Sequence, residues 1–215
     1  MDELFNDWKK RDVHKDSLFI SDGVNNDELW KESDFRILFL LKEAYDSKRT
    51  TGSWHLPNYI KKRKAAGRTF KPLGQWAYGI QKIKSTGNIE DFLDHGKEIH
   101  DALMSSAVVN IKKSQGKKRS SDGDLMKYIK SDWDLLEQQI TILNPNIIVC
   151  GKTFHLIKKQ LKGAIKISDR IYRYNDFIFV DFWHPANRAS NLMNYYALNA
   201  LVYKYMKKTI TKKSS

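Results

Sequence analysis

Short segments of almost uninterrupted apolar residues recur along the chain and predict buried β-strands. They are rich in β-branched and aromatic residues, and apolar and polar positions do not alternate cleanly within them. This pattern is typical of strands that are covered on both faces, as in a parallel sheet. The segments are Arg36–Leu41, Ala107–Ile111, Asn146–Cys150 and Phe177–Phe182.

Between these segments, apolar residues recur at helical spacing. Ser131 with Asp134 resembles a capping box, and Asn144-Pro145 stops the helix that begins there. The wide stripe of Tyr196, Ala200 and Leu201 is interpreted as core. The predicted helices are Leu4–Trp8, Gly74–Ile83, Ile89–Met104, Ser131–Leu143, Thr153–Leu161 and Ser190–Lys207.

Strands that alternate with helices predict an α/β fold, namely a three-layer sandwich around a central, four-stranded, mostly parallel sheet. The chain has 215 residues, which is the length of one such domain. We therefore expect a single domain over residues 1–206, with residues 1–35 as a helical extension packed on it. Residues 207–215 are expected to form a disordered basic tail.

The charge of the chain indicates its partner. Lysine and arginine total 38 against 25 acidic residues, which gives a net charge of +13. A strongly basic surface attracts polyanions, so we expect a monomer that binds DNA, single or double stranded. Binding to a ribosome or to anionic lipid, or a surface that serves only solubility, are the alternatives.

Several classes of protein are excluded by the composition. No stretch approaches the roughly 20 apolar residues of a membrane span, and the N-terminus lacks the apolar region of a signal peptide. The only cysteine, Cys150, excludes an internal disulfide framework and a cysteine-ligated iron–sulfur cluster. We expect a cytoplasmic protein, nucleoid-associated if bacterial, with no cofactor, no metal and no membrane partner. Gly151-Lys152-Thr153 resembles the end of a phosphate-binding loop, but that motif requires a glycine five residues before Gly151, where this chain has Asn146. We therefore expect a tight turn between a strand and a helix at this point.

Polar and charged residues follow each predicted strand. In open parallel sheets, ligands bind beyond the carboxyl ends of the strands, so these side chains are expected to meet on one rim. The residues are Lys42, Glu43, Tyr45 and Asp46 after the first strand, Asn110, Lys112 and Lys113 at the second, Lys152 after the third, and His184 and Arg188 after the fourth. The run from Lys112 to Arg119 is a candidate phosphate-contacting loop.

The order of these residues resembles the uracil-DNA glycosylase superfamily over about residues 36–206. His184-Pro185-Ala186-Asn187-Arg188 is similar to that family's second motif, His-Pro-Ser, which in one branch is followed two positions on by Arg. Lys42-Glu43-Ala44-Tyr45-Asp46 is most similar to the first motif Gly-Glu-Ala-Pro-Gly, and Asn110 matches a base-reading Asn at the end of the second strand. The chain departs from these motifs at Lys42, Tyr45 and Ala186.

This resemblance implies a DNA base glycosylase that hydrolyses the N-glycosidic bond of uracil, or of a related damaged or modified base, flipped from DNA. His184 would donate a hydrogen bond to the leaving base, and Glu43 or Asp46 would orient water and stabilise the sugar cation. Asn110 would bind the edge of the base, and Tyr45, or Trp54 further along the chain, would stack on its face. Phosphates would be bound by Lys42, Lys112, Lys113, Lys152 and Arg188.

Other interpretations of the same residues remain open. Ala44 and Ala186 also suit a catalytically inactive protein of this fold that binds nucleic acid or a base, and an enzyme of free nucleosides is a third alternative. His184 could cap a turn, Asn110 could be a buried structural amide, and the carboxylates could form surface ion pairs.

Overall fold

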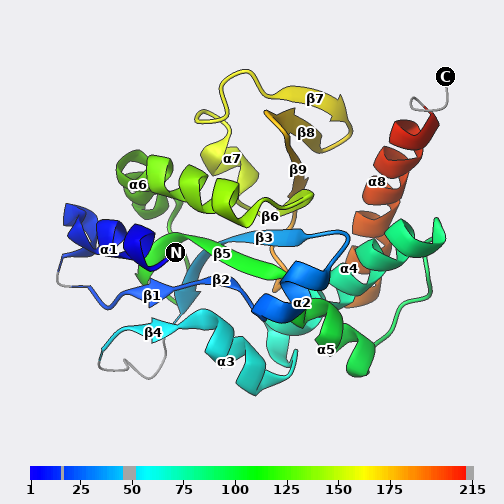
Figure 1. Ribbon diagram of the computed structural model, residues 1–215, viewed down its shortest axis with the longest axis horizontal. Coiled ribbons are helices and arrows are strands. Elements are labelled where there is room, and N and C mark those ends of the chain that lie inside the picture. Colours follow the sequence, from blue (N-terminus) through cyan, green and yellow to red (C-terminus); the bar gives the residue numbers. More distant parts are fainter. Residues whose placement is uncertain (16, 46–51, 212–215) are drawn as a thin grey trace.

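A seven-stranded mixed sheet forms the centre of the computed structural model, which describes residues 1–15, 17–45 and 52–211 (Figure 1). The strand order is β2-β5-β3-β6-β9-β8-β7. Four neighbouring strands run parallel: β5 (Ala107–Gly116), β3 (Ile37–Tyr45), β6 (Ile147–Gly151) and β9 (Phe177–Phe182). They coincide with the four apolar segments, so the predicted α/β class with a parallel centre is confirmed.

The sheet is larger than the expected four strands. The two-residue strand β2 (Gly23–Val24) adds antiparallel to β5 at one edge. The hairpin of β7 (Ile165–Ser168) and β8 (Ile171–Tyr174) adds antiparallel to β9 at the other edge. The hairpin was missed because β7 has no buried position and β8 has only one, Ile171, whereas only strands buried on both faces form long apolar runs.

Helices cover both faces of the sheet and create two separate cores (Figure 1). On one face lie α4 (Gly67–Thr86), α5 (Lys97–Met104) and α8 (Asn191–Thr211). On the other lie α1 (Asp2–Lys10), α6 (Asp122–Leu143) and α7 (Phe154–Ile157). The arrangement is therefore three-layered, as predicted.

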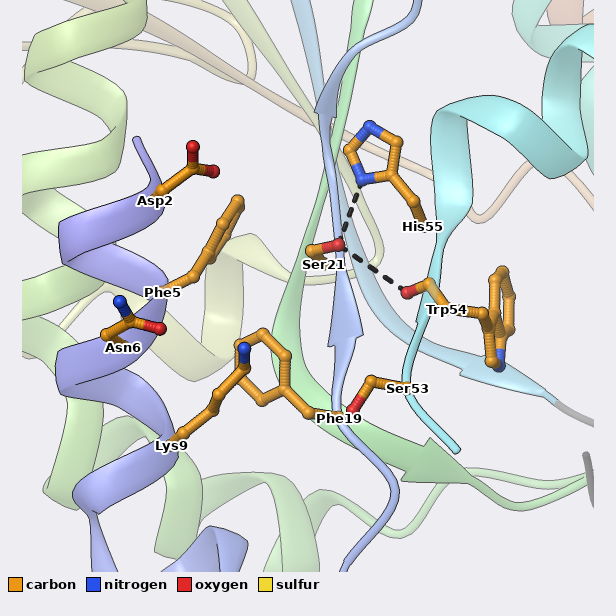
Figure 2. A pocket seen from close by; sticks show the side chains of 9 residues that line it. All are labelled: Asp2, Phe5, Asn6, Lys9, Phe19, Ser21, Ser53, Trp54 and His55. Carbon is orange, nitrogen blue, oxygen red and sulfur yellow. Dashed lines mark hydrogen bonds between the residues drawn. The ribbon is translucent and has the colours of Figure 1, made fainter. Parts of the chain in front are cut away.

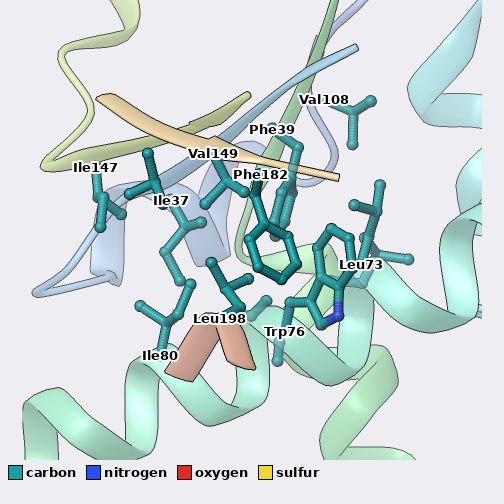
Figure 3. Packing of buried hydrophobic residues seen from close by; sticks show 14 of the residues in the cluster. Ile37, Phe39, Leu73, Trp76, Ile80, Val108, Ile147, Val149, Phe182 and Leu198 are labelled. Atoms are coloured by element: carbon teal, nitrogen blue, oxygen red, sulfur yellow. The ribbon is translucent and has the colours of Figure 1, made fainter. Parts of the chain in front are cut away.

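Residues alternate between the two cores along each central strand. In β3, Phe39 joins the first core and Leu38 joins the second, because successive side chains of a strand point to opposite faces. Figure 3 shows Trp76 of α4 and Leu198 of α8 close to Phe39 and Phe182 in the first core. Burial on both sides fixes the register of β3 and with it the position of the residues at its carboxyl end.

The N-terminal segment does more than extend the domain. Besides α1, a 3₁₀ turn (Asp12–His14) and α2 (Asp27–Glu32), it contributes β2 to the main sheet. It also contributes β1 (Ile20–Ser21), which pairs in parallel with β4 (Trp54–His55). The chain then enters α3 (Leu56–Arg63).

Several helices differ in length from the prediction. The helix α5 begins only at Lys97, because Gly96 before it has a φ of 147° that is incompatible with a helix. The helix α8 continues to Thr211, so the helix includes part of the predicted disordered tail. Among the described residues, no helix is both long enough and apolar enough to span a bilayer.

Candidate active site

A cavity of about 650 Å³ opens at the carboxyl ends of the central strands. Its size falls within the range of roughly 300–1,000 Å³ that is common for ligand sites. Five residues predicted from the sequence line it together: Glu43, Tyr45, Asn110, His184 and Arg188. The predicted catalytic residue Asp46 lies outside the described residues. The expected convergence on one rim is therefore found for these five side chains.

His184 lies in the loop between β9 and α8. The backbone N–H of Ala186 donates to Nδ1 of the ring at 3.1 Å, so a neutral ring carries its proton on Nε2. Burial, followed by the charges of Lys42 and Lys152, lowers the pKa of His184 from 6.5 to about 4. The ring thus caps its own turn and also lines the cavity as a neutral hydrogen-bond donor.

Asn187 fixes the backbone of this loop. Its backbone N–H and its Nδ2 both donate to the carbonyl oxygen of His184, at 3.0 and 2.8 Å. Its Oδ1 accepts from the backbone N–H of Ala189 at 2.7 Å and from Nδ2 of Asn194 at 3.2 Å. The loop is therefore tied to the start of α8, which limits the positions that His184 can take.

Asn110 is held from behind by Asp22, a residue without any distinguishing sequence pattern. Asn110 is 2% exposed, and its backbone N–H and Nδ2 donate to Oδ2 of Asp22 at 2.8 and 3.3 Å. Because a carboxylate only accepts, Nδ2 must face Asp22, which fixes the orientation of the amide. The buried carboxylate also accepts from Lys113 and from Gln139. Asn110 is thus both a buried amide and a part of the cavity wall.

Glu43 supplies a buried carboxylate to the same cavity. Its side chain is 3% exposed, and Oε2 has no hydrogen-bond partner among the described residues. The ammonium of Lys112 lies 3.5 Å from Oε2 and compensates its charge. Gly116 packs against the other side, since a Cβ at that position would lie 2.6 Å from Cγ of Glu43. Oε2 of Glu43 can therefore accept a hydrogen bond from a bound ligand or from water.

The prediction that Lys112 and Lys113 bind DNA phosphates is wrong. Strand β5 continues to Gly116, so both residues lie within it and not in a loop. The ammonium of Lys112 contacts Asp124 at 2.8 Å. Lys113 is fully buried, and its ammonium donates to Asp22 at 2.5 Å and to Gln139 at 2.8 Å. Both ammonium groups are used inside the fold.

Only the second half of the basic run faces the cavity. Lys117, Lys118 and Arg119 line its edge, as do Arg68 and Arg188. Lys42 and Lys152 are not among the lining residues. Lys42 pairs with Asp122 at 2.7 Å, and this bond, followed by one from His155, keeps the pKa of Asp122 below its ordinary value. Lys152 is exposed. DNA binding by Lys42 and Lys152 stays a prediction.

Aromatic side chains from outside the sheet complete the cavity wall. Trp54, Tyr59 and Phe70, called the aromatic wall below, come from β4, α3 and the first turns of α4. Ring centroids are 5.8 Å apart between Trp54 and Tyr59 and 6.0 Å apart between Tyr59 and Phe70. Of the three rings, only Trp54 was expected near a bound base. The sequence did not indicate that Tyr59 and Phe70 lie over the strand ends, because their position depends on tertiary packing.

A smaller cavity of about 410 Å³ lies beside β4, between α1 and the paired strands β1 and β4 (Figure 2). Trp54 contributes to both cavities. In the smaller one, the hydroxyl of Ser21 is 2.9 Å from Nδ1 of His55, as drawn in Figure 2. This cavity lacks the buried carboxylate and amide of the larger one, so the larger cavity is the candidate active site.

The described parts of the chain contain no group of three or more His, Cys, Asp or Glu side chains placed to hold a metal ion. Comparison of the sequence with protein-family models and with curated proteins gave no match.

Proposed function

We propose that the protein is a DNA base glycosylase related to the uracil-DNA glycosylase superfamily, which hydrolyses the N-glycosidic bond of uracil or of a related modified base. One observation carries the proposal: Glu43, Asn110 and a neutral His184, which are far apart in the chain, line one cavity with cations at its edge. Such a cavity suits a base flipped out of the nucleic acid, with its phosphates near the cations.

The base would be recognised by Asn110. Its amide offers a carbonyl oxygen as acceptor and a second N–H as donor, the combination that a pyrimidine edge with a carbonyl and a ring N–H requires. Because Asp22 already fixes the amide, little side-chain entropy would be lost when the base binds. The exposed ring of Tyr45 at the cavity could stack on the base.

The departing base would be stabilised by His184. As the bond between C1′ and the base nitrogen breaks, the electron pair moves into the base, and negative charge collects on its carbonyl oxygens. The Nε2–H of a neutral ring can donate to such an oxygen, and with a pKa of about 4 the ring stays in this form throughout the physiological range.

Glu43 would act on the sugar. Its buried carboxylate can stabilise positive charge at C1′ and orient the attacking water, whose oxygen bonds to C1′ while a proton passes to the carboxylate. The base anion then takes up a proton, so that the products are the free base and an abasic site. Asp46 stays a second candidate for this role, because it lies outside the described residues.

The test is incubation with single- and double-stranded oligonucleotides that carry uracil or modified bases, followed by alkaline cleavage and detection of the free base. We expect a product, and we expect Asn110→Ala, His184→Ala and Glu43→Gln each to lower the single-turnover rate by about two orders of magnitude or more. Lys84→Gln, at an exposed position on α4 that does not line the cavity, serves as the control.

A binding protein without activity is the second candidate. It is favoured by Ala44, which stands where uracil-excising enzymes often carry a water-activating Asp or Asn, and by Ala186, which replaces the serine of the second motif. If a broad panel of bases yields no product while the oligonucleotides still bind, the enzyme proposal is wrong and the binding protein is supported. In that case Asn110→Ala should change which base is preferred.

A further inference from the structure

We propose that the aromatic wall is a stacking site for an unpaired nucleobase next to the target base, so that the substrate is single-stranded nucleic acid. The proposal rests on the proposed function in that it places a target base near Asn110 and His184. It adds a second subsite, made of residues to which the proposed chemistry assigns no role.

The cavity has room and surface for a second base. Its volume of about 650 Å³ is far more than one pyrimidine base fills. Tyr59 in the aromatic wall is 44% exposed, and Tyr45 on the same cavity is 54% exposed. Adjacent rings in the wall are inclined to each other by 53° and 62°, so they are not stacked face to face and do not cover one another. Large exposed aromatic rings that gather at a cavity are typical of binding surfaces.

Cations accompany the rings. Lys61, Lys62 and Arg63 form the end of α3, beginning two residues after Tyr59, and Lys64 comes directly after the helix; all four are exposed. The guanidinium of Arg63 lies 5.8 Å from the centre of the Tyr59 ring, and Arg68 lines the cavity. Aromatic rings combined with a basic groove are the means by which proteins bind unpaired strands, because the cations track the phosphates and every base has a face that can stack.

An unpaired strand fits this surface better than a duplex. In a duplex, the bases beside a flipped nucleotide remain paired and stacked on their neighbours, so their faces are not available to Tyr59. Freeing one would cost a few kcal/mol of unstacking. In a single strand the neighbouring base is free to turn onto the ring at little cost.

The test measures binding without chemistry. A fluorescein-labelled oligodeoxythymidine and the same strand annealed to its complement are titrated with wild type, Tyr59→Ala and Tyr59→Phe, and fluorescence anisotropy is read. We expect Tyr59→Ala to weaken single-strand binding about 5- to 150-fold, as the loss of one stacked base does. We expect Tyr59→Phe, which keeps the ring, to stay within about twofold of wild type, since it retains the stacking face. Duplex binding should change little in either variant.

A matched pair of charge variants tests the cations of the subsite. Arg63→Gln should weaken single-strand binding, whereas Lys158→Gln, an exposed residue that does not line the cavity, should not. Unfolding in urea confirms that all variants are folded. If Tyr59→Ala weakens single-strand and duplex binding equally, or weakens neither, the stacking site is wrong.

The outcomes separate this inference from the proposed function. Tyr59-dependent binding of the single strand without release of any base would support the stacking site and contradict the glycosylase. Release of a base from duplexes alone, with no effect of Tyr59→Ala, would support the glycosylase and contradict the stacking site.

Discussion

Asp22 and Lys113 form a buried ion pair directly behind the cavity wall. Both are excluded from solvent, and their charged atoms lie 2.5 Å apart. Gln139 and the carbonyl oxygen of Asn110 accept further hydrogen bonds from the lysine, so all three of its protons are used. A buried charge is tolerated only when it is paired and hydrogen-bonded in this way. The pair therefore sets both the local stability and the orientation of Asn110.

Removing one partner of this pair should be costly. We expect Lys113→Met to lower the free energy of unfolding by about 3–5 kcal/mol, because Asp22 would be left as an uncompensated buried charge. Lys117→Met removes the same charge from an exposed position and should cost less than about 0.5 kcal/mol. Urea denaturation of both variants measures the difference. Equal effects would mean that the buried pair contributes no more than a surface lysine does.

Titration of His184 should contribute to the pH dependence of the free energy of unfolding. Its pKa in the folded protein, about 4, is below the ordinary value of 6.5, so the unfolded chain takes up this proton first as the pH falls. The neutral ring of His184 therefore makes its full contribution to the free energy of unfolding above about pH 6.5. As the pH falls toward 4 this contribution is lost, which lowers the free energy of unfolding by roughly 3 kcal/mol in total.

The variant His184→Gln should lack this loss, because it has no titrating ring. The measurement is the free energy of unfolding at pH 7 and at pH 4.5 for wild type, His184→Gln and the exposed control His95→Gln. The control should retain the pH dependence of the wild type. If His184→Gln retains it as well, the ring is not buried in its neutral form.

The irregularity in β5 is the element that places Glu43. The pairs Glu43–Lys112 and Tyr45–Gly116 show that β5 has more residues than β3 between these two points. The extra residues bring Gly116 against the side chain of Glu43, at a distance where no Cβ can fit. Bulges of this kind often re-aim a side chain next to an active site.

A methyl group at Gly116 should therefore disturb activity. The Cβ would lie 2.6 Å from Cγ of Glu43 and 2.8 Å from the carbonyl oxygen of Ala44, so Glu43 or the strand must shift. We expect Gly116→Ala to lower base release by about tenfold or more, since displacement by about 1 Å can cost far more than that. Gly123→Ala in α6 is the control, because its Cβ would meet only Oγ of Ser121 at 3.8 Å. Activity unchanged by Gly116→Ala would argue against a role for Glu43.

The sequence was sufficient to predict the central strands because burial on both faces leaves long apolar runs. It did not predict β1, β2 and β4, which have two residues each and whose pairing depends on distant segments. The full length of α4 was also missed. Pro72, Gly74 and Gly79 disfavour a helix locally, yet the two glycines give the close contacts with Ile99 of α5 and Asn199 of α8.

The candidate site was predictable where it depends on strand ends. Glu43, Asn110 and His184 could be found because parallel strands bring their carboxyl ends to one edge. Asp22 and Tyr59 could not, since their positions result from how the segments around β1 and α3 pack. Lys112 and Lys113 were misplaced because the end of an apolar run was taken as the end of the strand, whereas β5 continues through buried, paired cations.

At the scale of the whole molecule, the basic residues that give the net charge of +13 lie in different environments. Some cations are neutralised inside the fold, as Lys113 is by Asp22. Others gather at the candidate active site, where Lys117, Lys118 and Arg119 follow β5 directly. If the charge serves to bind nucleic acid, these cavity-edge cations should release more counterions on binding than cations elsewhere on the surface.

The salt dependence of binding distinguishes a defined track of cations from a diffuse positive field. Each phosphate contact to a single strand adds about 0.7 to the slope of log K against log salt concentration. Replacing Lys117, Lys118 and Arg119 together with Gln should therefore reduce the slope by about 2. The matched replacement of Lys158, Lys159 and Lys162, which are exposed and do not line the cavity, removes the same charge and should leave the slope nearly unchanged. If both triple variants reduce the slope equally, nucleic acid is attracted by net charge alone. Only a strand that is bound along the cavity edge would respond differently to the loss of these three cations and to the loss of three cations elsewhere.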